Sequence, residues 1–106
     1  MKKRESMQIH VEKNGTRAVI RVEGAIQGVQ EAADVKKSLT EQAGAGAGSI
    51  SLVLADAAVL PSSVIGALLR LVEIEKVEVA LRVRSPELRE SLRKLNFDTI
   101  LNVQEM

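Results

Sequence analysis

The stretch ISLVLADAAVLPSSVIGALL, residues 50–69, decides the fold of this chain. It opens with the apolar run 50–54, in which only Ser51 is polar, as expected for a central strand that is buried on both faces. Pro61 then interrupts the chain, because its ring fixes φ and removes a backbone donor. Beyond the proline, Ile65, Leu68, Leu69 and Val72 recur at helical spacing. The stretch therefore predicts a buried strand, a loop and a helix that starts just after Pro61.

Upstream of this stretch, apolar and polar residues alternate over residues 7–12 and 17–23. This period is the one expected for half-buried strands. Asn14 and Gly15 stand between the two segments and tolerate the positive φ angles of a tight type I′ turn. The two strands are therefore predicted to form an antiparallel hairpin.

A helix is predicted from Val29 to about Gln42, after a break bracketed by Gly24 and Gly28. The alternating Ala and Gly residues of the segment 43–48 then indicate a mobile connector. A phosphate-binding loop is the alternative interpretation, but it needs a Lys followed by Ser or Thr at the start of a helix, and neither is present here. We therefore interpret the segment as a connector.

Downstream, residues 77–83 alternate as a fourth strand. Ser85, Pro86 and an acid then provide a well-formed helix start, with the serine as N-cap. Asn96 is predicted to end this helix in the left-handed conformation, and residues 100–103 provide a last strand. The predicted order ββαβαβαβ indicates an α/β domain in which a mixed sheet with an opening hairpin carries helices joined by right-handed crossovers.

Composition excludes several classes of function. The 106 residues suit one domain, and a net charge of +1 is too small to attract nucleic acid. A single aromatic residue leaves almost no surface for stacking on bases or sugars. No cysteine is present, which removes disulfides and thiolate sites and suits a reducing cytosol. No apolar run reaches the roughly 20 residues that a membrane span needs, so we expect a cytoplasmic protein without membrane insertion.

Catalytic and metal-binding candidates are few. His10, the sole histidine, lies on the polar side of the first strand and is interpreted as a surface residue. Asp56 follows the buried strand, where α/β proteins often place ligand groups, but no second acid, histidine or cysteine accompanies it. The basic residues near Arg89 are interleaved with glutamates, as in a solvated face. We therefore expect no enzyme activity, no metal and no cofactor.

Pro61, Ser62 and Ser63 stand out because they lie between the buried strand and the apolar helix. In one interpretation, Ser62 or Ser63 simply caps the helix. In the other, the serine is a modification site, because the positive end of a helix tolerates a phosphate and a partner would sense the added charge. The residues alone leave both interpretations open.

Residues 50–54 followed by VLPSSVIGALL, residues 59–69, resemble the central motif of STAS domains: a strand, an apolar pair, Asp-Ser-Ser-Gly or a relative, and an apolar helix. The resemblance continues through the fourth strand, the helix start SPELRESL at residues 85–92, and the segment from Leu95 to Leu101. It covers residues 7–103, which we therefore predict to form one STAS-like domain after a flexible N-terminus, residues 1–6.

The resemblance implies a bacterial anti-sigma-factor antagonist that regulates transcription by switching partners. The implied partner is an anti-sigma factor with the ATPase fold of a GHKL-type serine kinase. By position, Ser62 aligns with the phosphoacceptor of the family and Ser63 with its neighbour. The implied contact surface comprises Leu60, Pro61, Ser62, Ser63, Val64 and Ile65. Pro61 replaces the usual Asp, and Val64 replaces the usual Gly and is expected to add bulk where a partner approaches.

Three functions from different classes follow. The leading hypothesis is the antagonist. The residues support its binding role more strongly than its control by phosphorylation. The alternatives are a STAS-type accessory subunit that braces a transporter ATPase, or a scaffold that acts without phosphorylation. The last is a small-ligand sensor or enzyme that uses the loop 55–63.

Overall fold

The computed structural model describes residues 7–105, so the predicted flexible N-terminus, residues 1–6, lies outside the described residues. The elements follow in the order β1 (Gln8–Asn14), β2 (Arg17–Glu23), α1 (Val29–Gly44), β3 (Ser49–Leu54), α2 (Ser62–Glu73), β4 (Glu78–Val83), α3 (Pro86–Lys94), the 3₁₀ turn η1 (Phe97–Thr99) and β5 (Asn102–Glu105). This order confirms the predicted ββαβαβαβ arrangement and the α/β class.

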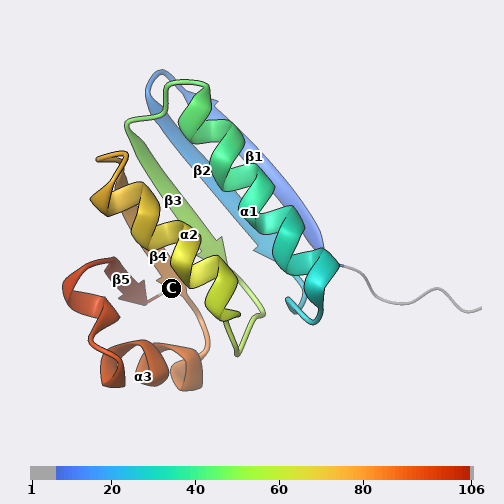
Figure 1. Cartoon of the computed structure of the whole chain (residues 1–106). Coiled ribbons are helices and arrows are strands. Elements are labelled where there is room, and N and C mark those ends of the chain that lie inside the picture. The colour runs from blue at the N-terminus through green and yellow to red at the C-terminus, as the bar shows by residue number, and fades with distance from the viewer. Residues whose placement is uncertain (1–6, 106) are drawn as a thin grey trace, which may run out of the picture.

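The five strands form one sheet in the order β1-β2-β3-β4-β5. Strands β1 and β2 are antiparallel, and the remaining neighbours are parallel. Each parallel connection moves one strand further in the same direction. Because such crossovers are right-handed, they place their helices on the same face of the sheet. Figure 1 shows α1 and α2 side by side on this face, with α3 beyond them near the end of β4.

The core lies between this face and the helices, and β3 runs through its middle. Strands β2 and β4 flank β3, and Ile50, Leu52 and Leu54 point from it into the core with no exposed surface. Helix α1 contributes Val35 and Leu39 from the opposite layer. Leu, Ile, Val and Ala thus fill the core, as the near-absence of aromatic residues requires.

Helix α1 is longer than predicted. It continues to Gly44, so the first two residues of the expected connector are helical. The N–H of Ala45 still donates to the carbonyl of Glu41 at 2.9 Å, and the chain turns only at Gly46, where φ is +98°. The reason is that alanine favours the helix more than any other residue. Ala47 is buried, so the expectation of a mobile connector over residues 43–48 is wrong in its extent.

The closing strand starts later than predicted. Residues 100 and 101 were expected within it, but the backbone N–H groups of Ile100 and Leu101 both donate to the carbonyl of Phe97, at 3.1 and 2.8 Å. These bonds keep the two residues in the turn that follows η1, and β5 begins at Asn102. Leu101 still enters the core, with 1% of its surface exposed.

The predicted boundaries of α3 are confirmed. The Oγ atom of Ser85 accepts the backbone N–H of Leu88 at 3.2 Å, and Pro86 occupies the first turn. After the helix, Asn96 adopts the left-handed conformation, with φ of 63°. None of the helices described between residues 7 and 105 is long and apolar enough to cross a membrane.

The cap of α3 gives a matched test. Ser85→Ala removes the acceptor for the N–H of Leu88 and is expected to lower the free energy of unfolding by about 1 kcal/mol. Ser91→Ala makes the same chemical change at an exposed position inside the helix and is expected to raise stability slightly, because alanine is the better helix former. Urea unfolding of both variants measures the difference. Equal losses of stability would contradict the cap.

Candidate functional site

The candidate site lies at the edge of the sheet where the parallel strands end. The β2–α1 loop, residues 24–28, and the β3–α2 loop, residues 55–61, meet there, and the N-termini of α1 and α2 emerge from it (Figure 1). In open α/β sheets, ligands and partners usually bind at the carboxyl ends of the strands. The fold therefore places the stretch around Pro61 at the edge where such sites occur.

Backbone and side-chain contacts tie the two loops together. The carboxylate of Asp56 accepts the backbone N–H of Gly24 at 2.7 Å. One residue earlier, the N–H of Ala55 donates to the carbonyl of Val22 at 3.1 Å. Ala57 and Leu60 are buried and anchor the loop from below. Asp56 thus has the loop-stabilising role that its isolation in the sequence favours.

Helix α2 begins one residue earlier than a serine cap would allow. Its N-cap is Pro61, which has the extended conformation that caps adopt, with φ of −60° and ψ of 146°. The carbonyl of Pro61 accepts the N–H groups of Val64 and Ile65 at 3.0 and 3.1 Å. Ser62 is consequently the first helical residue, and no side chain caps the helix. The interpretation in which Ser62 or Ser63 caps α2 is therefore wrong.

The structure separates the predicted contact residues into two groups. Leu60 and Val64 are buried, with 6% and 0% of their surface exposed, so their side chains face the core. Ser62 and Ser63 are exposed, and Pro61 and Ile65 are half-buried. Val64 therefore adds no bulk to the surface, contrary to the expectation from the sequence. The part of the predicted contact surface open to a partner consists of Pro61, Ser62, Ser63 and Ile65.

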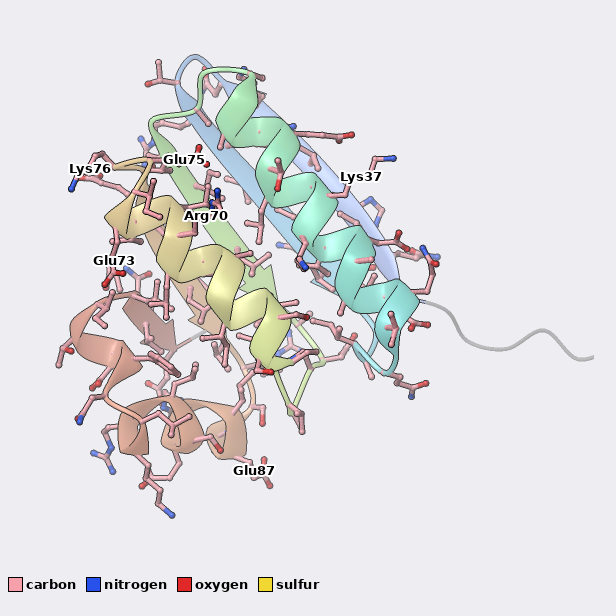
Figure 2. The ribbon with its side chains drawn as sticks, in the orientation of Figure 1. Lys37, Arg70, Glu73, Glu75, Lys76 and Glu87 are labelled. Atoms are coloured by element: carbon pink, nitrogen blue, oxygen red, sulfur yellow. The ribbon has the colours of Figure 1, made fainter. Side chains whose placement is uncertain are left out.

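The outer surface of the first half of α2 is uncharged. No charged residue occurs between Leu60 and Leu69, and Figure 2 shows Arg70, Glu73 and the residues that follow it gathered toward the other end of the helix. The N–H groups of Ser62 and Ser63 have no acceptor within the helix and give this end a positive potential. A charge added at Ser62 would therefore change the surface strongly.

Gly66 is a feature that the sequence analysis missed. It lies inside α2 and is exposed, and a Cβ atom added to it would meet nothing within 4 Å. A glycine inside a helix costs about 1 kcal/mol relative to alanine. No contact within the described part of the domain requires a glycine at this position. The signal was available in the sequence, since Gly66 interrupts a helical pattern one turn after Ser62.

Two exposed valines at the same edge were also missed. Val59 precedes α2 with 68% of its surface exposed, and Val29 begins α1 with 88% exposed. The periodicity of the sequence does not distinguish such residues from core residues, because their exposure depends on where the loops lie. Together with the neutral start of α2, they give this edge an apolar character.

The remaining candidates lie elsewhere. His10 is on β1, and its Nε2 atom lies 3.7 Å from a carboxylate oxygen of Glu23 on the neighbouring strand, with both side chains exposed. In the basic region, Arg89 pairs with Glu105 at 2.8 Å and Arg93 with Glu90 at 2.9 Å. Within residues 7–105, no three His, Asp or Glu side chains gather closely enough to hold a metal ion.

Comparison with known proteins agrees with this geometry. The family model described as STAS domain matches residues 8–106. The chain belongs to the STAS domain family. No curated protein matches the sequence at a significant level.

Two solved structures share this STAS fold. A crystal structure of an anti-sigma factor antagonist from Mycobacterium paratuberculosis superposes with a TM-score of 0.77 at 16% identity, covering 93% of this chain and 86% of the other. The anti-sigma factor antagonist SpoIIAA in its unphosphorylated form superposes with a TM-score of 0.71 at 19% identity, covering 93% and 88%. At these identities, the similarity establishes the fold.

The contact between the two loops gives the second test. Asp56→Ala removes the acceptor for the N–H of Gly24, so we expect the free energy of unfolding to fall by about 1 kcal/mol. Hydrogen exchange at the Gly24 amide should accelerate at the same time. Asp98→Ala, at an exposed aspartate outside the site, is the control and should leave that amide unchanged. Unaltered exchange at Gly24 in Asp56→Ala would show that the bond does not hold the loop.

Proposed function

We propose that this STAS domain is a non-enzymatic regulatory module that binds a protein partner through the first half of α2, as an anti-sigma-factor antagonist. The observation that carries the proposal is the surface formed by Ser62, Ser63 and Gly66: it is exposed, uncharged and built from small residues at the positive end of a helix. Pro61 and Ile65 border it. Such a surface lets the backbone of a partner come close.

Gly66 supports this role on energetic grounds. Its missing side chain destabilises α2, and no neighbouring atom of the described residues occupies the space that a Cβ would take. An exposed glycine at this place is accounted for if the partner fills that space. Ala67, half-buried beside it, continues the low surface.

Ser62 is the proposed phosphoacceptor, with Ser63 as its neighbour. Because Pro61 occupies the capping position, helix capping uses neither hydroxyl. A phosphoserine carries a charge of about −1.5 to −2 and is tolerated beside the free N–H groups of a helix N-terminus. The folded domain would accept the phosphate, whereas a partner docked on a neutral surface would meet a new charge. Phosphorylation would thus release the partner without unfolding the domain.

The proposed partner is an anti-sigma factor with the fold of a GHKL-type serine kinase, which would place the domain in the cytoplasm as a bacterial regulator of transcription. Pro61 favours one alternative. It provides no carboxylate where the family usually has Asp, so binding without phosphorylation, including service as an accessory subunit of a transporter ATPase, is the second candidate.

The third prediction concerns the phosphate. Incubation with the cognate anti-sigma kinase and ATP should add one phosphate to Ser62, detected by mass spectrometry of the peptides. Ser62→Ala should abolish the modification, and Ser63→Ala should retain it. Ser62→Asp should weaken binding to the same kinase by at least about tenfold, a loss of about 1.4 kcal/mol. Ser91→Asp, an equal charge change on exposed α3, is the control.

The results separate the candidates. Absence of phosphate on either serine, with binding that Ser62→Asp still weakens, would favour the scaffold over the switch. Unchanged binding in Ser62→Asp would remove α2 from the contact surface altogether. Binding to a transporter ATPase with none to the kinase would identify the accessory subunit.

The fourth prediction separates stability from binding at Gly66. Gly66→Ala should raise the free energy of unfolding by up to about 1 kcal/mol, because alanine favours the helix and meets no atom there. It should at the same time weaken partner binding. Gly44→Ala is the matched control, since Gly44 is also helical, exposed and free of neighbours within 4 Å, but lies on α1. Isothermal titration and urea unfolding measure the two effects; equal binding by both variants would contradict the close approach.

A further inference from the structure

The face of the sheet opposite the helices stays open in the described part of the chain. The strand registers place Glu12, Val19, Ser51, Ala80 and Asn102 in one row across this face and His10, Arg21, Val53, Arg82 and Gln104 in the next. These side chains are exposed or half-buried, with the exception of Val53. The crossovers all lead to the other face, so no described helix covers these rows.

Val53 shows how the centre of this open face is shielded. Only 4% of its surface is exposed, although it lies outside the cluster of core residues. In the register, Arg21 and Arg82 are its neighbours on either side. Long arginine side chains cover apolar surface with their methylene groups while their charged ends stay in water. Val53 and, in the neighbouring row, Val19 are thus the apolar residues near the centre of the face, and Arg21 lies next to both.

The charges of the open face are balanced. It carries the arginines Arg17, Arg21 and Arg82 and the glutamates Glu12, Glu23 and Glu78. Equal numbers of the two signs give no net field to attract a polyanion such as nucleic acid. A surface with both positive and negative side chains instead suits a partner whose negative groups face the arginines and whose positive groups face the glutamates.

A second copy of this chain carries that arrangement. Two copies can stack with their open faces together, related by a two-fold axis that runs between the sheets and perpendicular to the strands. Each strand then lies opposite the same strand of the other copy, in the opposite direction. We place the axis so that it crosses β2 at the level of Ile20. Positions equally far from Ile20 then meet, so Arg17 of each copy lies opposite Glu23 of the other. On β1, the corresponding centre is Val11, and Glu12 lies opposite His10. A closed two-fold dimer repeats each such contact twice.

The area of the face sets how strongly two copies can associate. Hollows of ≈ 370 Å³ and ≈ 610 Å³ lie on either side of Val19. The axis places Arg21 of the partner copy opposite this valine. Strand spacings of about 4.8 Å and rises of about 3.3 Å per residue give a face of about 20 by 20 Å. About 400 Å² per copy, or about 800 Å² in total, would be buried, which is below the standard size of a stable interface, so the dimer is expected to be weak.

We infer that this STAS domain associates with a second copy of itself through the open face of the sheet, with Arg17 of each copy paired to Glu23 of the other. This interface goes beyond the proposed function, because it lies on the face opposite α2 and leaves Ser62 and Gly66 free. A dimer would present two α2 surfaces, so one assembly would hold two partners.

Sedimentation equilibrium at protein concentrations from about 10 μM to 1 mM tests the inference. The wild-type chain should pass from monomer to dimer in this range, as expected for a small interface. Arg17→Glu should weaken the dimer at least about tenfold. The new glutamate at position 17 of each copy would then face Glu23 of the other copy, so two repulsive contacts would replace two attractive ones. The double variant Arg17→Glu with Glu23→Arg should restore it, since the pair is complementary again.

Two controls keep the result specific. Lys37→Glu reverses a charge on the exposed side of α1 (Figure 2) and should leave the dimer unchanged. Ser62→Asp should also leave it unchanged, so failure of the proposed function and failure of the dimer are distinguishable. Circular dichroism verifies that each variant is folded. A monomer up to 1 mM, or a dimer unaffected by Arg17→Glu, would overturn the inference.

Discussion

The burial of β3 is the constraint on which the rest of the structure depends. Its residues Ile50, Leu52 and Leu54 cannot face water, so it needs strands on both sides and helices over one face. The expectation that β3 is buried on both faces is wrong, because no described helix covers the other face, where Ser51 is half-buried. Parallel neighbours in turn need long connections, and α1 and α2 provide them. A one-residue slip of β3 would exchange Leu52 for Ser51 in the core. The register of the sheet is therefore fixed by this strand.

Because every crossover advances in the same direction, the two faces of the sheet have different roles. One face buries the helices and forms the core. The other carries charges of both signs, and Val53 at its centre lies between Arg21 and Arg82 in the register. The same topology brings the ends of the parallel strands and the starts of α1 and α2 to one edge. The partner surface that we propose and the open face are thus separate, and one can be occupied while the other is free.

At the site, stability and function use different atoms. Pro61 supplies the conformation of the cap through its fixed φ, and its carbonyl accepts the N–H groups of Val64 and Ile65. Leu60 and Val64 hold the segment to the core. The serine hydroxyls and the bare backbone of Gly66 are left at the surface, where they contribute nothing to packing within the domain. Chemical change at Ser62 can therefore alter binding with little effect on folding.

The sequence by itself determined the order of the elements, because hydrophobic periodicity, Asn14-Gly15 and the cap at Ser85 are local signals. It also singled out the stretch around Ser62. The tertiary structure decided which residues of that stretch face outward: Leu60 and Val64 flank Pro61, Ser62 and Ser63 in sequence, but only packing against the sheet shows that these two are buried. It decided as well that Gly66 borders open space and that one face of the sheet is uncovered. These features depend on contacts between distant segments, which local patterns do not encode.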